Sequence, residues 1–99
     1  MYRTILLPLA KRDIQEAAIW YNTKQKGLGK KFTSSIRKKV HFIRQNPKAV
    51  SFRYGDSRTA VLDRFPYMIH FTVDDHKKII IISAVLSMHR NPQIWKTRK

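Results

Sequence analysis

Apolar residues in the first half of the chain recur three and four positions apart, which is the spacing of one face of a helix. One such stripe runs from Leu9 to about Lys26, and a second begins near Gly29 and ends before Asn46-Pro47. Gly27 can adopt the left-handed angles that stop a helix, and the residue before a proline avoids helical angles. The pattern predicts two helices joined as a hairpin. Their apolar faces consist of Ala10, Ile14, Ala17, Ala18 and Tyr21 in the first helix and Phe32, Ile36, Val40 and Ile43 in the second.

The remaining segments have the spacing or composition of strands. The segment Tyr67–Val73 alternates apolar and polar residues, which predicts a half-buried strand. The run Ile79–Ile82 is apolar on both faces, so the strand that contains it, Lys77–Leu86, belongs inside the sheet as its central strand. Asn91-Pro92 is typical of a cap and first turn, and predicts a short helix bearing Ile94 and Trp95. The other predicted strands are Tyr2–Leu7, Val50–Tyr54 and Thr59–Leu62, the last two flanking the turn Gly55-Asp56-Ser57.

Together these elements predict one α+β domain over residues 1–99. Their order is β-α-α-β-β-β, and the last part contains three or four strands, depending on whether the two short extended pieces are separate. We expect the helical hairpin to pack on one face of a small, mainly antiparallel sheet, with a short C-terminal helix.

The charge of the chain points to a negatively charged partner. It carries 21 Lys and Arg against 6 Asp and Glu, a net charge of +15. No carboxylate occurs between Glu16 and Asp56, a stretch that holds ten Lys or Arg. Such an excess repels itself, so it indicates nucleic acid, a membrane or an acidic protein as partner rather than a need of the fold. The apolar helix faces are needed for a small core, which argues against a membrane.

The sequence also excludes several kinds of site. It has no cysteine, so disulfides, thiolate zinc sites and a catalytic thiol are absent. The histidines have no metal-ligand spacing and Gly27-Leu28-Gly29 is no phosphate loop, so we expect neither metal nor cofactor. The N-terminal apolar run is short and lacks a cleavage site, so we expect a cytoplasmic protein with no signal peptide or membrane span.

Three groups of basic residues are candidates for binding. On the second helix, Lys30, Arg37 and Arg44 project opposite the apolar stripe, flanked by Lys31 and Lys38. The second group, which includes Arg53, Arg58 and Arg64, surrounds the short predicted strands, and the third, which includes Arg90, follows the last predicted strand. If neighbouring strands pair, the sheet brings Arg58 and Arg64 of the second group near Arg90 of the third, an arrangement suited to a phosphodiester or an acidic peptide. The binding candidates are Lys30, Arg37, Lys38, Arg44, Arg53, Arg58, Arg64, Arg90 and Trp95.

One histidine stands beside a basic residue after the last strand. His89 precedes Arg90, and imidazole can transfer protons at neutral pH while a guanidinium stabilises the charge of a pentacoordinate phosphate. Metal-free cleavage of RNA is therefore chemically possible, with Arg58, Arg64, His89 and Arg90 as the candidate catalytic residues. No complete acid and base pair is visible in the sequence.

Motifs along nearly the whole chain resemble those of the RelE/ParE toxin superfamily. They include Glu16-Ala17 with Trp20-Tyr21, the Gly27-Leu28-Gly29 turn with Phe32, Phe65-Pro66-Tyr67, and Ala84-Val85 followed by Arg90-Asn91-Pro92, Trp95 and Arg98. The resemblance implies a type II toxin, sometimes described as a plasmid stabilisation protein, that inhibits growth and is neutralised by a cognate acidic antitoxin in a hetero-oligomer.

The same resemblance offers two targets. Members similar to RelE cut messenger RNA on the ribosome and would make this chain an endoribonuclease, whereas members similar to ParE inhibit DNA gyrase and are not nucleases. Ser87 and Asp63 stand where RelE-like members carry a histidine and an arginine, and neither can replace those groups. These departures favour a ParE-like toxin, acting on gyrase or on another target. The sequence leaves open a ribosome-dependent nuclease and an inactive toxin-like binding domain.

Overall fold

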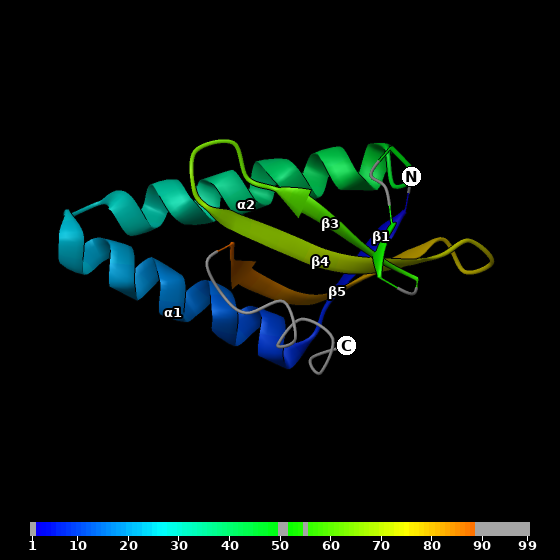
Figure 1. The fold of residues 1–99 in the computed structure, drawn as a ribbon, viewed down its shortest axis with the longest axis horizontal. Coiled ribbons are helices and arrows are strands. Elements are labelled where there is room, and N and C mark those ends of the chain that lie inside the picture. Colours follow the sequence, from blue (N-terminus) through cyan, green and yellow to red (C-terminus); the bar gives the residue numbers. More distant parts are fainter. Residues whose placement is uncertain (1, 50–51, 55, 89–99) are drawn as a thin grey trace.

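The computed structural model of the chain describes residues 2–49, 52–54 and 56–88 (Figure 1). Proline at the first helical position starts α1 directly after β1, and Gly27, with a φ of 88°, joins the two helices. The elements are β1 (Arg3–Leu6), α1 (Pro8–Lys24), α2 (Leu28–Gln45), β2 (Phe52–Tyr54), β3 (Ser57–Val61), β4 (Tyr67–Asp74) and β5 (Ile79–Ser87). The predicted α+β class and helical hairpin are confirmed.

The strands form one five-stranded sheet in the order β1-β5-β4-β3-β2. β1 pairs with β5 in parallel, and the other neighbours are antiparallel, so the expectation of a mainly antiparallel sheet is confirmed. The isoleucine run lies on β5, an interior strand as predicted, although β4 rather than β5 is central among the five. Four strands follow the hairpin, within the expected three or four, because the segment before the turn at Asp56 pairs with β3 as a short strand of its own.

Both helices contribute to one core against the sheet. Three of the four residues of the predicted α2 stripe, Phe32, Ile36 and Ile43, are buried and Val40 is partly buried, while α1 buries Ala10, Ala17 and Tyr21. These side chains form one cluster with residues that alternate along the strands, namely Ala60, Ile69, Phe71, Ile80, Ile82 and Val85. The hairpin therefore covers one sheet face (Figure 1), as its amphipathic spacing predicts.

The expectation that β4 is half-buried is wrong. Met68 and His70, which alternate with the core residues Ile69 and Phe71, are also buried, at 4% and 0% exposure. Met68 forms a second apolar cluster with Ala84 and Leu86. Because the second cluster buries residues of β4 on the face away from the hairpin, the alternation of β4 reports which residues face the hairpin and not which face water.

Some predictions fall on residues 89–99, outside the described residues. They are the short C-terminal helix and the positions of His89, Arg90 and Trp95. Among the helices in residues 2–49, none has the length and apolar character needed to span a membrane.

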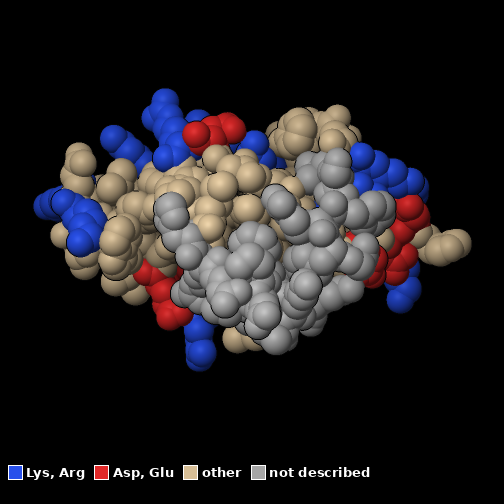
Figure 2. All heavy atoms as spheres, in the orientation of Figure 1, with Lys and Arg blue, Asp and Glu red and all other residues tan. Residues whose placement is uncertain are grey.

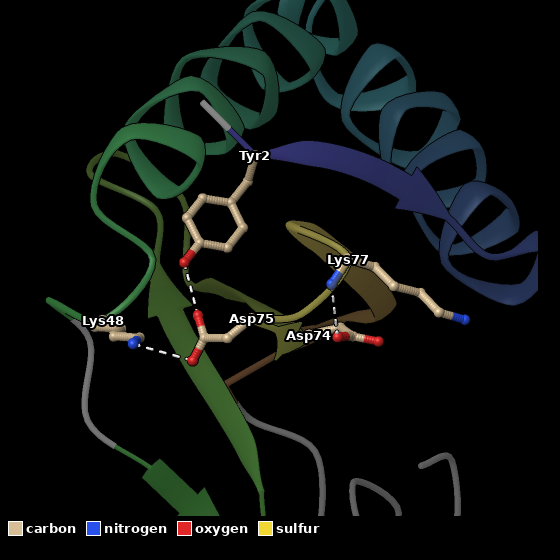
Figure 3. A network of polar contacts seen from close by, with 5 residues as sticks. All are labelled: Tyr2, Lys48, Asp74, Asp75 and Lys77. Carbon is tan, nitrogen blue, oxygen red and sulfur yellow. Dashed lines mark hydrogen bonds and ion pairs between the residues drawn. The ribbon is translucent and has the colours of Figure 1, made fainter.

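A polar network at the turn between β4 and β5 ties the start of β1 to the end of α2 (Figure 3). The Tyr2 hydroxyl donates to one carboxylate oxygen of Asp75 at 2.7 Å, and Lys48 Nζ lies 3.0 Å from the other. The guanidinium of Arg44 donates from Nε to the Tyr2 carbonyl at 3.1 Å. Three segments distant in sequence thus meet at one exposed carboxylate. The hydrogen bonds from Tyr2 and Lys48 hold the pKa of Asp75 below its usual value.

This network makes a small, pH-dependent contribution to stability. Because the pKa of Asp75 is lowered by folding, its contribution is complete above about pH 4 and is lost as the pH falls through the folded-state pKa. We expect Asp75→Asn to lower the melting temperature slightly at neutral pH and not in strong acid. Melting curves of both proteins between about pH 2 and pH 7 check this. A difference that persists at the acid end would contradict it.

Candidate functional site

Four aromatic rings join the helical hairpin to the connection between β3 and β4. Tyr21 lies 5.4 Å from Phe32 and 4.9 Å from Phe65, measured between ring centroids, and Phe32 lies 5.1 Å from Tyr67. The Phe65-Pro66-Tyr67 string therefore has a structural role, since its two rings anchor the connection on the hairpin while Pro66 stays exposed. The surface around Pro66 contains two hollows.

The first hollow, which we call the basic groove, lies between α2 and the connection from β3 to β4. Its volume is about 690 Å³. Leu28, Phe65, Pro66 and Tyr21 supply apolar and aromatic walls, and the polar residues that line it are Lys31, Ser35, Lys38, Asp63 and Arg64. The groove thus combines an apolar lining with three cations, which suits an acidic segment with apolar side chains.

The cations of the basic groove have little local compensation. Its carboxylate, Asp63, pairs with Lys39 at 3.3 Å. Within the described part of the chain, no carboxylate forms an ion pair with Lys31, Lys38 or Arg64. Figure 2 shows basic side chains around the end of the molecule where the helices join, with acidic atoms in a few small groups. An anionic partner would therefore gain electrostatic energy here without first breaking internal pairs.

The second hollow, the aromatic hollow, lies between α1 and the paired ends of β4 and β5. Its volume is about 440 Å³. Trp20, half exposed at 51%, lines it with Tyr21 and Tyr67. Two carboxylates, Asp13 and Glu16, lie among its lining residues, which also include Ala17, Pro66, Val85 and Ser87. No Lys or Arg of the described residues lines this hollow.

One carboxylate of the aromatic hollow also completes the sheet. Asp13 Oδ2 accepts the backbone N–H of Val85 at 3.0 Å. β1 pairs with β5 only up to Ile82, so this N–H lies beyond the end of its neighbour strand. A side chain of α1 takes the place of a strand there, which fixes α1 against the end of β5.

Tyr21 and Pro66 line both hollows, so the two form one continuous surface. Burial raises the pKa of the Tyr21 hydroxyl, and Tyr67 beside it raises this pKa further. Tyr21 therefore remains a neutral phenol at physiological pH, and the surface changes from anionic to cationic on either side of it.

The sequence-predicted binding residues have different surroundings. On α2, Lys30, Arg37 and Lys38 are exposed, and of these Lys38 lines the basic groove. Arg44 is partly buried and bonds to the Tyr2 carbonyl. Arg53 belongs to β2, and its side chain is not among those described.

Arg58 lies near the start of β3, whereas Arg64 lies beyond its last residue, Val61. Arg58 pairs with Phe71 on β4, whereas Arg64 precedes Tyr67, the first residue of that strand. Since a strand rises about 3.3 Å per residue, Phe71 and Tyr67 are roughly 13 Å apart along it. Met88, the last described residue, donates its N–H to the Pro66 carbonyl at 2.8 Å, two residues after Arg64. The structure places Arg64, but not Arg58, at this end of the sheet.

Asp63 and Ser87, where RelE-like members are expected to carry an arginine and a histidine, make contacts within the fold. Asp63 forms the ion pair with Lys39 and is largely exposed. Ser87 pairs with Tyr67 at the end of β5 and lines the aromatic hollow. Neither position supplies an imidazole or a guanidinium. In residues 2–49, 52–54 and 56–88, no group of three His, Asp or Glu could hold a metal ion.

Sequence reasoning did not assign the aromatic hollow. Trp20 and Glu16 belong to the motif of the first helix and Asp13 lies one turn earlier on that helix, but their spacing alone does not show that they face the end of β5. The sequence pattern presents Lys31 only as a flanking charge. A signal was present in Trp20, because aromatic residues are enriched at protein–protein interfaces.

A family model described as the ParE toxin of the type II toxin-antitoxin system parDE matches residues 4–92. The chain has no significant match among curated protein sequences.

Solved structures of toxins have the same fold. The chromosomal ParDE TA system from P. aeruginosa matches with a TM-score of 0.76 at 21% identity, over 88% of this chain and 96% of that one. The intact E. coli RelBE toxin-antitoxin complex matches with 0.69 at 18% identity, over 91% and 100%. The isolated E. coli RelE toxin matches with 0.68 at 17% identity, over 98% and 95%. At these identities the similarity establishes the fold alone.

Proposed function

The chain belongs to the ParE toxin family of type II toxin-antitoxin systems, and from this membership we propose that it arrests growth by inhibiting DNA gyrase. We further propose that a cognate acidic antitoxin holds it inactive in the cytoplasm, in a hetero-oligomeric complex. The observation that carries the proposal is the match of the ParE family model to residues 4–92. The net charge of +15 supports an acidic partner.

The described surface supports protein binding more than RNA cleavage. The basic groove has apolar walls as well as cations, and these walls suit side chains rather than a phosphate backbone alone. At the two positions where RelE-like members are expected to carry histidine and arginine, Ser87 and Asp63 provide neither a proton carrier nor a phosphate clamp. A toxin that binds its target without cutting RNA needs neither group.

The test is induced expression in growing cells without an antitoxin. We expect growth arrest, loss of plasmid supercoiling and inhibition of purified gyrase. Messenger RNA from the arrested cells should remain intact when mapped by primer extension. His89→Ala should leave the toxicity unchanged, because no proton transfer is needed.

Each contrary result would reject the proposal and identify a different function. Cleaved transcripts with normal supercoiling would identify a ribosome-dependent nuclease, and loss of toxicity in His89→Ala would contradict a mechanism without proton transfer. Harmless expression of a folded protein would identify an inactive binding domain. Arrest with intact transcripts and unaffected gyrase would show a different target.

A further inference from the structure

The two hollows carry opposite charges, so a segment that binds across both meets cations at one end and carboxylates at the other. The basic groove has Lys31, Lys38 and Arg64. The aromatic hollow has Asp13 and Glu16, two of only six carboxylates in the chain. Tyr21 and Pro66 lie between the two charged regions and line both. We propose that the antitoxin segment that covers this surface is itself polarised, with acidic side chains in the basic groove and a cationic side chain in the aromatic hollow.

The chemistry of the aromatic hollow fits a guanidinium or an ammonium. A cation binds well where a carboxylate and an aromatic face are close together, because the ring attracts it electrostatically while the carboxylate pairs with it. The Trp20 ring already attracts a cation within the protein, since Lys24 Nζ lies 4.9 Å from its ring centroid. The volume of about 440 Å³ leaves space for a side chain between the helix and the sheet.

A uniformly acidic segment would bind this surface less well than a polarised one. Its carboxylates would gain energy in the basic groove but would meet Asp13 and Glu16 at the other end. Repulsion between like charges at an interface disfavours the reversed orientation of a bound segment, so the two hollows select one orientation. The exposed Pro66 and the Tyr21 ring between the hollows suit apolar side chains in the middle of the segment. This inference rests on the proposed antitoxin and specifies how it is recognised.

Two synthetic peptides of identical composition test the proposal with the full-length protein. The polarised peptide has a block of glutamates, a central pair of leucines and one arginine at the other end. In its isomer the arginine is moved into the glutamate block. We expect the polarised peptide to bind about tenfold more tightly in fluorescence anisotropy, the effect of one good charge-assisted pair.

Variants of the protein locate the source of this preference. Glu16→Gln should remove most of the difference between the peptides, whereas the control Asp56→Asn, in the turn before β3 and outside both hollows, should keep it. Lys38→Gln with Arg64→Gln should weaken both peptides, and the polarised peptide more, because the isomer already places a cation beside these two positions. A change confined to the ratio of the two peptides distinguishes a binding role of Glu16 from loss of folding.

The proposal is overturned if the peptides bind equally, if neither binds, or if Glu16→Gln preserves the preference. Failure of the proposed function is separate, because growth arrest and gyrase inhibition are measured without any peptide. A protein that arrests growth but does not distinguish the peptides rejects only the polarised antitoxin segment.

Discussion

Replacing Phe32 by alanine is expected to lower the free energy of unfolding by about 3–5 kcal/mol, the largest loss expected from any single substitution proposed for this protein. Phe32 is fully buried, and its ring contacts Tyr21, Phe65 and Tyr67 with centroid distances of 5.4, 5.2 and 5.1 Å. Truncation removes the apolar area of the ring and leaves a cavity where the hairpin meets the sheet. Because a domain of this size has only about 5–15 kcal/mol of stability, a large fraction of the protein would unfold on mild heating.

Phe42 provides a matched control on the same helix. Its side chain is 43% exposed, and it lies near Lys39 Nζ, 5.4 Å from its ring centroid. We expect Phe42→Ala to cost less than about 1 kcal/mol, as is usual for surface changes. Urea unfolding followed by circular dichroism measures both variants. Equal losses would show that the aromatic cluster does not hold the hairpin on the sheet.

The second large effect is expected for Gly29→Ala, which should cost about 3 kcal/mol. A Cβ atom at Gly29 would lie 2.5 Å from the Ala18 carbonyl oxygen and 2.8 Å from Asn22 Nδ2. The carbonyl belongs to the backbone of α1 and cannot rotate away. The change would also disturb the hydrogen bond from the Gly29 N–H to Asn22 Oδ1, at 2.8 Å, which satisfies an amide in the first turn of α2.

Gly27→Ala separates this steric effect from backbone strain. Gly27 has a φ of 88°, but a Cβ atom there meets nothing within 4 Å. We expect a cost of about 1–2 kcal/mol from the left-handed angle alone. Thermal melts of both variants should therefore place Gly29→Ala below Gly27→Ala. The opposite order would mean that the two helices do not approach as closely as the structure shows.

Phe32→Ala and Gly29→Ala would also test the binding surface, because the hairpin forms one wall of each hollow. The basic groove needs α2 at a fixed distance from Phe65 and Pro66, and the aromatic hollow needs α1 beside β5. A variant that loosens the hairpin should therefore lose peptide binding and toxicity together. Glu16→Gln, by contrast, changes one exposed charge and should leave stability almost unchanged.

Predictions from the sequence succeeded where the signal was local. The stripe of α2 predicted its buried residues, and Gly27 marked the join between helices, because helical spacing is set by a few neighbouring residues. The interior position of the isoleucine run followed from its apolar character on both faces. The prediction for β4 failed because burial there is not a local property. Polar residues on its second face, such as His70, are buried by neighbours that the local pattern does not report.

By itself, the sequence determined the helical hairpin, the mainly antiparallel sheet, the family resemblance and the excess of positive charge that favours an acidic partner. Each of these follows from spacing, motif order or total charge, which do not require knowledge of distant contacts. Only the tertiary structure decided which charges share a surface. It placed Arg58 near the start of β3 and Arg64 beyond its end, used Arg44 to hold β1, and brought Asp13 and Glu16 of α1 against the end of β5. Those contacts join residues up to 72 positions apart, and the packing of the whole core sets them.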